Sequence, residues 1–142
     1  MEGMERFPSH PARDMAIRSM TAVEASDREG WLSLYADDAI VEDPVGPSSF
    51  DPDGTGHRGR ESIAGFWDNV ISQAPVRFSI RESYAAGKEC ANVGTITIHL
   101  DGGSRAVVDG VYTYRIDDHG RIAAMRAFWE QDKMRIEGAD TA

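Results

Sequence analysis

Apolar residues recur with helical spacing in two long segments of the first half of the chain. Within residues 12–25, Ala16, Met20 and Val23 fall at positions i, i+4 and i+7, which predicts an amphipathic helix. Residues 60–73 have the same period and predict a further helix. The side chains expected on its buried face are Ile63, Phe66, Trp67 and Val70.

A shorter helix is predicted between these two. Ser26 and Glu29 have the Ser-x-x-Glu spacing of a capping box, so the helix is expected to begin there. Its buried face is assigned to Trp31, Leu32 and Tyr35.

The pattern changes from helical to alternating after Pro75, which predicts a series of strands. The Gly-containing turns at 101–103 and 117–120 separate the last three and indicate hairpins. Helices followed by a strand meander predict an α+β fold. We expect a cone-shaped curved antiparallel sheet packed on three N-terminal helices, a cystatin-like α+β barrel with an apolar mouth. The four predicted strands are 76–84, 90–100, 104–116 and 121–134.

One further strand, 39–43, ends on a carboxylate. By alternation Asp43 shares a face with Val41, so it is expected to point into the cone. Pro44 follows and has no backbone N–H to donate to that carboxylate. A carboxylate at the edge of an apolar cavity has a raised pKa and is suited to be a general base. The alternative is a solvated aspartate at the end of a strand, before the loop at 44–59.

Composition narrows the classes of function. The chain has 142 residues, which fits one domain, and a formal net charge of -9. Such an acidic protein is not expected to bind nucleic acid or an anionic membrane. The single cysteine, Cys90, excludes an internal disulfide, and the four histidines show no spacing typical of a metal site. We expect a cytoplasmic protein without a metal or cofactor.

Three motifs carry a resemblance to a known family. The segments LYADDAIVEDPVG, HRGRESIAGFW and YRIDDHGRIAAMRAFW resemble the bacterial Δ5-3-ketosteroid isomerases of the nuclear-transport-factor-2-like superfamily. The segments SDREGWLSLYADD and DPDGTGHRGRE resemble in particular a mycobacterial, isomerase-like branch. The resemblance implies a ketosteroid-isomerase-like domain at 12–132, with a flexible N-terminus at 1–11 and a C-terminal tail at 133–142. It also implies a homodimer formed through the outer face of the sheet, and a role in lipid metabolism.

The resemblance assigns roles to individual residues. Asp43 matches the catalytic base, and Trp129 and Trp67 match aromatic pocket positions. Two hydrogen-bond donors of the family differ here, because Ser19 stands for a tyrosine and Tyr112 for a protonated aspartate. Tyr112 is either an oxyanion donor or a core residue, and Ser19 is a weaker donor candidate. The remaining residues expected at the substrate are Tyr35, Val41, Phe66, Met125 and Tyr114.

Three functions remain open at this point. The first is a cofactor-free isomerase that moves a double bond beside a ketone in a steroid-like, apolar polycyclic molecule. The second is a binding protein for such molecules, and the third is a polyketide cyclase or dehydratase. Arg126 is expected to face outward, which argues against an epoxide-hydrolase arrangement. The loop at 46–58 is expected to be either a lid or an inert insertion.

Overall fold

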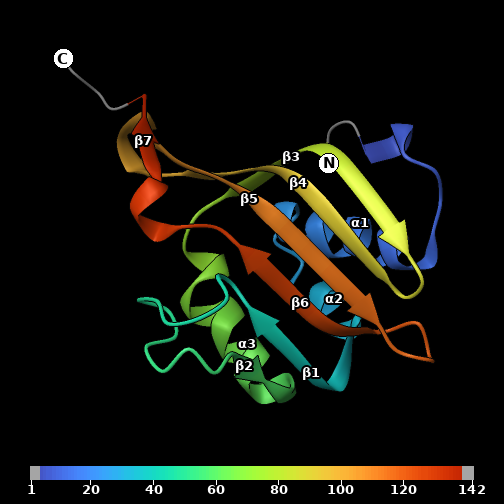
Figure 1. Ribbon diagram of the computed structural model, residues 1–142. Coiled ribbons are helices and arrows are strands. Elements are labelled where there is room, and N and C mark those ends of the chain that lie inside the picture. The colour runs from blue at the N-terminus through green and yellow to red at the C-terminus, as the bar shows by residue number, and fades with distance from the viewer. Residues whose placement is uncertain (1–3, 139–142) are drawn as a thin grey trace.

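The computed structural model describes residues 4–138 and confirms the α+β fold. Three helices lie against one face of a curved sheet (Figure 1). The helices are α1 (Pro11–Glu24), α2 (Arg28–Ser33) and α3 (Gly59–Asn69), with short 3-10 turns η1 (Met4–Arg6), η2 (Ile71–Gln73), η3 (Asp101–Gly103) and η4 (Gln131–Lys133). The strands are β1 (Tyr35–Glu42), β2 (His57–Arg58), β3 (Val76–Ala86), β4 (Glu89–His99), β5 (Arg105–Ile116), β6 (Ile122–Phe128) and β7 (Arg135–Glu137).

The sheet has the order β2-β1-β6-β5-β4-β3, and β7 pairs with β5. All these pairs are antiparallel except β1 with β6, which run parallel, so the expectation of a purely antiparallel sheet is wrong at that pair. The parallel pair arises because the chain crosses over by way of α3 and the meander before β6 returns beside β1.

The long strands bend around the helices at a defined point. The register of β3 shifts between Ile80 and Glu82, and such a bulge increases the local bend and twist. Gly94 of β4 pairs with Ile80, and a Cβ at this glycine would clash with the carbonyl oxygen of Ser79. The absence of a side chain therefore permits the close approach that curves the sheet into a cone.

The helix predictions hold with three corrections. In α1 the buried residues include Ala16 and Met20, as the spacing predicted. The N-cap of α2 is Asp27, whose carboxylate accepts a hydrogen bond from the Gly30 N–H at 3.0 Å, so the capping box at Ser26 is wrong. Tyr35 begins β1 and does not belong to α2, although it is fully buried as expected. The predicted third helix is also interrupted at Val70, before η2.

The strand predicted over 121–134 is shorter in the structure. β6 ends at Phe128, and the chain then forms η4 and β7, where Ile136 pairs with Ala106 of β5. This part of the predicted tail therefore extends the sheet.

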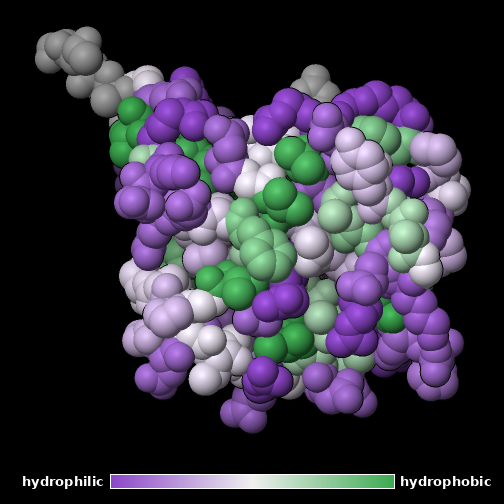
Figure 2. All heavy atoms as spheres, in the orientation of Figure 1, coloured by the Kyte–Doolittle hydropathy of each residue, from purple (hydrophilic) through white to green (hydrophobic). Residues whose placement is uncertain are grey.

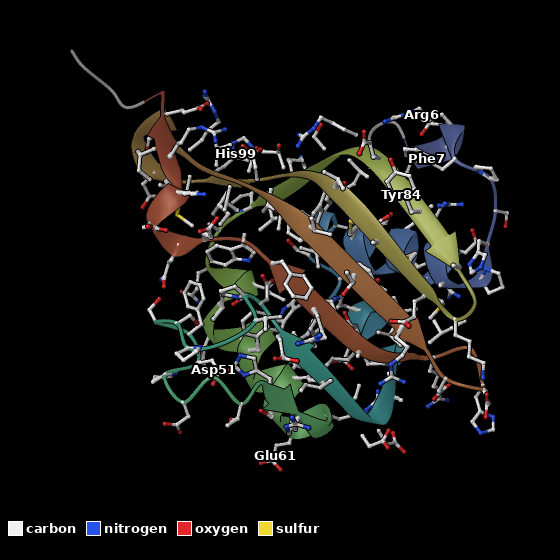
Figure 3. The ribbon with its side chains drawn as sticks, in the orientation of Figure 1. Arg6, Phe7, Asp51, Glu61, Tyr84 and His99 are labelled. Atoms are coloured by element: carbon white, nitrogen blue, oxygen red, sulfur yellow. The ribbon has the colours of Figure 1, made fainter. Side chains whose placement is uncertain are left out.

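At the N-terminal end of the described residues, Met4 is buried. The Arg6 guanidinium donates to the carbonyls of Ile80 and Arg81 on β3, and Figure 3 labels Arg6. Residues 1–3 and 139–142, which belong to the predicted flexible N-terminus and tail, lie outside the described residues. Within residues 4–138, no helix is long and apolar enough to cross a membrane.

Candidate functional site

A cavity of about 360 Å³ lies between the helices and the inner face of the sheet. This volume is within the range of pockets that hold small organic ligands. Most of its lining is aliphatic or aromatic, from α1, α3, the β3–β5 meander and the segments after β1 and β6. Its polar lining residues among those described are few: Ser19, Asp43, Asn69, Gln73 and the tyrosine Tyr114.

Asp43 is the one acidic residue that lines the cavity within the described part of the chain. Its Oδ1 accepts a hydrogen bond from the Trp129 indole N–H at 2.6 Å. Burial raises the pKa of the Asp43 carboxyl, and the bond from Trp129 lowers it by a smaller amount. Asp43 is half-buried because it borders open cavity space, while the atoms around its carboxylate remove most of its hydration. Its basicity is therefore higher than that of a solvated aspartate.

A cluster of hydroxyl groups lies at the buried end of the site. Ser19 Oγ accepts from the Trp31 indole N–H at 3.0 Å and is 3.1 Å from the Tyr35 hydroxyl. Tyr114 lines the cavity together with Ser19. Burial raises the pKa of both phenols, and the negative charge of Asp43 raises it further. Both tyrosines are thus neutral at physiological pH and can donate a hydrogen bond.

Tyr112 is not among the residues that line the cavity. Its hydroxyl donates to the backbone carbonyl of Val108 at 3.3 Å, and its side chain is buried. The hydroxyl sits over Gly110, where a Cβ would lie 3.2 Å from it. Its role as an oxyanion donor therefore stays a prediction, and the structure gives its hydroxyl a backbone partner instead.

The structure brings most of the predicted site residues together. Those that line the cavity are Ser19, Asp43, Phe66, Tyr114, Met125 and Trp129. Three others are buried behind this lining: Tyr35, Val41 and Trp67, whose ring centroid lies 5.2 Å from that of Trp31. Arg126 is exposed and forms an ion pair with Glu42 at 2.9 Å, which confirms that it faces outward.

Several residues that line the cavity were not predicted from the sequence. Trp31 was assigned only to a buried helix face, yet it lines the cavity and bonds to Ser19. The apolar alternation of Ile96 and Ile98 on β4, and Val108 on β5, marked an inner sheet face without showing which part of that face stays open. Phe50, in the loop after β1, lines the cavity from a position that no periodicity predicts.

The loop after β1 borders the cavity mouth. Phe50 is 39% exposed although it lines the cavity. The loop is held by a hydrogen bond from Gln131 to Ser49 at 2.8 Å, and by one from the Gly56 N–H to Asp51 at 2.7 Å. A role of this loop as a lid stays a prediction.

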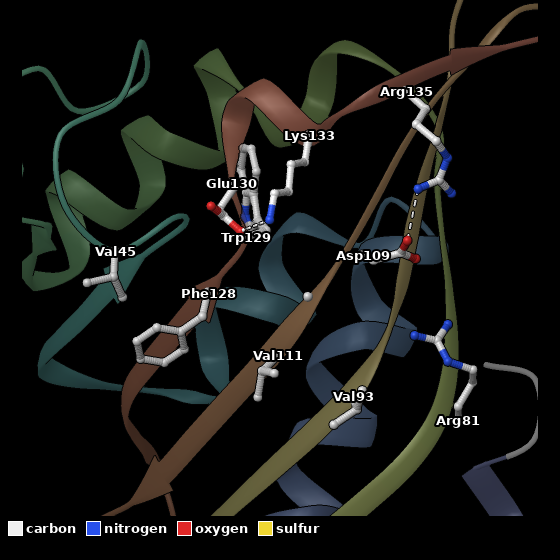
Figure 4. Close-up of a pocket in the computed structure, with 11 residues that line it drawn as sticks. Val45, Arg81, Val93, Asp109, Val111, Phe128, Trp129, Glu130, Lys133 and Arg135 are labelled. Atoms are coloured by element: carbon white, nitrogen blue, oxygen red, sulfur yellow. Dashed lines mark hydrogen bonds and ion pairs between the residues drawn. The ribbon is translucent and has the colours of Figure 1, made fainter.

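A second hollow, of about 660 Å³, lies on the outer face of the sheet (Figure 4). Val93, Val111 and Phe128 form its apolar floor, and charged residues surround them. Figure 2 shows apolar side chains gathered over the middle of this face, with polar residues around them. The charged residues of the hollow are Arg81, Asp109, Glu130, Lys133 and Arg135.

No group of three or more histidine, cysteine, aspartate or glutamate side chains within residues 4–138 is arranged to hold a metal ion. Cys90 is buried, and burial raises the pKa of its thiol, so its thiolate is disfavoured.

A curved sheet closed by three helices around an apolar cavity defines a nuclear-transport-factor-2-like protein. Residues 16–125 match the SnoaL-like domain family, and the chain belongs to this family. It is 30% identical over 122 residues to the steroid Δ-isomerase of Nocardioides simplex, a match that spans 86% of this chain and 92% of that protein.

Solved structures give the same result. The Δ5-3-ketosteroid isomerase from Mycobacterium sp. is 37% identical, with a TM-score of 0.85 over 90% of this chain and 99% of that one. RV0760c from Mycobacterium tuberculosis, in complex with estradiol-17β-hemisuccinate, is also 37% identical, with a TM-score of 0.84 over 89% of this chain and 99% of that one. The resemblance noted in the sequence is thus confirmed at the level of the family.

Proposed function

We propose that the protein is a cofactor-free steroid Δ-isomerase in which Asp43 is the general base. The observation that carries this proposal is a carboxylate with a raised pKa in a mostly apolar cavity. An isolated carboxylate of this kind accepts a proton from carbon more readily than a solvated one, and returns it to another carbon of the same substrate. The similarity to steroid and ketosteroid isomerases supports the same chemistry.

The reaction needs one proton to move in two steps. Asp43 takes a proton from the carbon between the ketone and the double bond, and the C–H electron pair moves into a dienolate whose negative charge lies on the former ketone oxygen. The protonated Asp43 then gives the proton to the far carbon of the former double bond, which restores the ketone in conjugation. The indole N–H of Trp129 bonds to Oδ1, which orients the carboxylate and leaves Oδ2 to exchange the proton.

The cavity supplies binding and exclusion of water. A flat polycyclic ketone gains affinity from apolar contacts with side chains such as Phe66, Met125 and Trp129. The same contacts keep water from the dienolate and maintain the high basicity of Asp43. A steroid substrate would place the protein in lipid metabolism.

A second candidate function is steroid binding without turnover. It is favoured by one observation: the hydroxyl of Tyr112, which stands at a donor position of the isomerases, donates to the Val108 carbonyl. RV0760c, a similar structure, is in complex with estradiol-17β-hemisuccinate. A binding protein requires the apolar cavity and does not require a donor aimed at the ketone oxygen.

A homodimer formed through the outer sheet face is part of the same proposal. The hollow on that face has an apolar floor, including Phe128 at 43% exposed, and a rim with charges of both signs. The ion pair between Arg135 and Asp109 marks one side of this rim (Figure 4). A surface that carries both signs can be self-complementary about a twofold axis, as a symmetric dimer requires.

The test is a spectrophotometric assay with 5-androstene-3,17-dione, together with a binding titration with estradiol. Formation of the conjugated enone, lost in Asp43→Asn, is the expected result. Binding of estradiol with no turnover in the wild-type protein would contradict the isomerase and support the binding protein. Neither binding nor turnover would contradict both functions.

A further inference from the structure

Gly110 lies on β5 next to the point where the chain leaves β6. The ladder between β5 and β6 ends at the pair Val111–Phe128, one residue away from Gly110. A Cβ on Gly110 would lie 2.6 Å from the Phe128 carbonyl oxygen and 3.0 Å from Trp129 Cβ. The first distance is shorter than real Cβ contacts, and the second is shorter than an ordinary contact between carbon atoms. The segment after β6 can therefore pack this closely on β5 only because residue 110 has no side chain.

The same segment holds the carboxylate of Asp43. The Trp129 indole N–H donates to Asp43 Oδ1 at 2.6 Å, and it is the one hydrogen-bond partner of this carboxylate within residues 4–138. The backbone next to Asp43 is tied to the end of β6 as well, because the Val45 N–H donates to the Ala127 carbonyl at 2.9 Å. The position of the carboxylate thus depends on where the chain lies at residues 127–129.

We infer that Gly110 is a positioning residue for the base, because its lack of a side chain lets Trp129 lie close enough to β5 to hold the Asp43 carboxylate. The inference rests on the proposed function and adds to it a residue outside the cavity lining. A methyl group at position 110 has to push Trp129 Cβ away by about half an ångström to reach an ordinary contact. A hydrogen bond weakens steeply as its length and angle depart from the optimum, so the bond from the indole to the carboxylate is weakened or lost.

Tyr112 offers a second route by which a side chain at position 110 could act. Its hydroxyl would lie 3.2 Å from a Cβ there, and it donates to the Val108 carbonyl at 3.3 Å. This contact involves the far end of a side chain, which turns aside at a lower cost than backbone does. The contact with Phe128 is shorter and involves a backbone carbonyl, so the geometry favours action through the segment after β6.

The test measures the pKa of the Asp43 carboxyl directly, by carbon-13 NMR titration, with Asp43→Asn to assign the signal. Loss of the indole bond raises this pKa, because the bond opposes the effect of burial. The other titratable side chains that interact electrostatically with Asp43 are the phenols of Tyr35, Tyr112 and Tyr114. Burial raises the pKa of all three, so they stay neutral in acid and do not contribute to the titration.

The variants are Gly110→Ala, alone and in the Trp129→Phe and Tyr112→Phe backgrounds, with Gly65→Ala as the matched control. Gly65 lies in α3 outside the cavity lining, and a Cβ there would meet open space. Gly110→Ala is expected to raise the pKa of Asp43 by about one unit, as for the loss of one hydrogen bond to a charged group. The same shift is expected in the Tyr112→Phe background and none in the Trp129→Phe background, which has no indole N–H. Gly65→Ala is expected to leave this pKa unchanged.

Four outcomes overturn the inference. The first is an unchanged pKa of Asp43 in Gly110→Ala, because a merely structural glycine would affect Tm alone. The second is an unchanged pKa in Trp129→Phe, which needs no substitution at the glycine. The third is a shift that Tyr112→Phe abolishes and Trp129→Phe retains. The fourth is a Gly110→Ala variant without the circular dichroism of a folded protein, which would assign the glycine to the sheet as a whole.

The same preparations separate this inference from the proposed function. Turnover of 5-androstene-3,17-dione by the wild-type protein, together with any of the four outcomes, overturns the role of Gly110 and leaves the isomerase intact. The expected pKa shifts without turnover contradict the isomerase and support the role of Gly110 in holding the carboxylate.

Discussion

Replacement of Asp43 by Asn is expected to lower activity and raise stability at the same time. The amide has nearly the same shape as the carboxylate, and its oxygen can keep the hydrogen bond from Trp129, which is 2.6 Å long in the native protein. The substitution therefore removes the charge and the proton-accepting oxygen with little change in packing.

The loss of activity follows from the cavity lining. No other carboxylate or histidine within residues 4–138 lines the cavity, so no neighbouring side chain can take over as base. General-base catalysis typically contributes about 10²–10⁴-fold in rate, which corresponds to about 2.7–5.5 kcal/mol. We expect kcat to fall by this factor, while KM changes little because the apolar contacts remain.

The gain in stability follows from the direction of the pKa shift. The pKa of Asp43 is raised by burial, so the folded protein binds this proton more tightly than the unfolded chain does. Stability therefore increases as pH falls towards the unfolded pKa, and the ionised carboxylate destabilises the fold at neutral pH. Removal of this charge is expected to stabilise the protein by about 1 kcal/mol at pH 7, or about 3 °C in Tm.

Both effects are measured on the same preparation, by enone absorbance and by thermal unfolding at pH 7 and at pH 3.5. The Tm difference between variant and wild type should shrink at the lower pH. The Asp43 carboxyl of the wild type is then close to neutral, as the amide of the variant is at either pH. The control is Asp38→Asn, because Asp38 is an exposed aspartate of β1; this variant should change neither quantity. A Tm for Asp43→Asn that is lower than that of the wild type at pH 7, or retention of full kcat, would refute the reasoning.

Three further predictions follow from the geometry. The pH profile of kcat/KM should lose activity on its acid side at a higher pH than the ordinary aspartate pKa of about 3.9, because Asp43 must be ionised and burial raises its pKa; an acid limb at or below that value would contradict this. Trp129→Phe should move the same limb to still higher pH, because the indole bond lowers the pKa of Asp43; the pH profile of the variant measures this, and an unmoved limb would show that the bond is unimportant in solution. Phe128→Glu should give a folded monomer in analytical ultracentrifugation, because it puts a charge on the apolar floor of the outer hollow, whereas Arg18→Glu on the helical side should leave the mass unchanged; a dimeric Phe128→Glu variant would argue against that face as the interface.

Local periodicity predicted most of the secondary structure because it reports which face of an element is buried. The spacing of Ala16 and Met20 located α1, and alternation located β3, β4 and β5. It failed where a non-local contact decides the outcome. The chain after Phe128 leaves β6 and returns as β7 beside Ala106, and no local pattern shows that pairing.

In the site, too, local patterns predicted some features, and non-local contacts decided others. Alternation from Val41, and the Pro after it, indicated that Asp43 points inward, and the structure has it at the cavity wall. The same rule treated Tyr112 and Tyr114 alike, since both lie on the inner face of β5. Only the packing around Gly110 and Val108 directs the Tyr112 hydroxyl to a backbone carbonyl, while Tyr114 lines the cavity.

By itself the sequence determined the α+β architecture, the inward carboxylate and the family resemblance, because each depends on the order of residues along one or two elements. The tertiary structure decided which inner-face residues border open space, that Trp31 and Tyr35 both bond to Ser19, and that Trp129 bonds to Asp43. The physical reason is that a hydrogen bond or a cavity depends on distances between side chains from several elements. Residues 19 and 114 lie far apart along the chain, and only the curvature of the sheet around α1 brings them together.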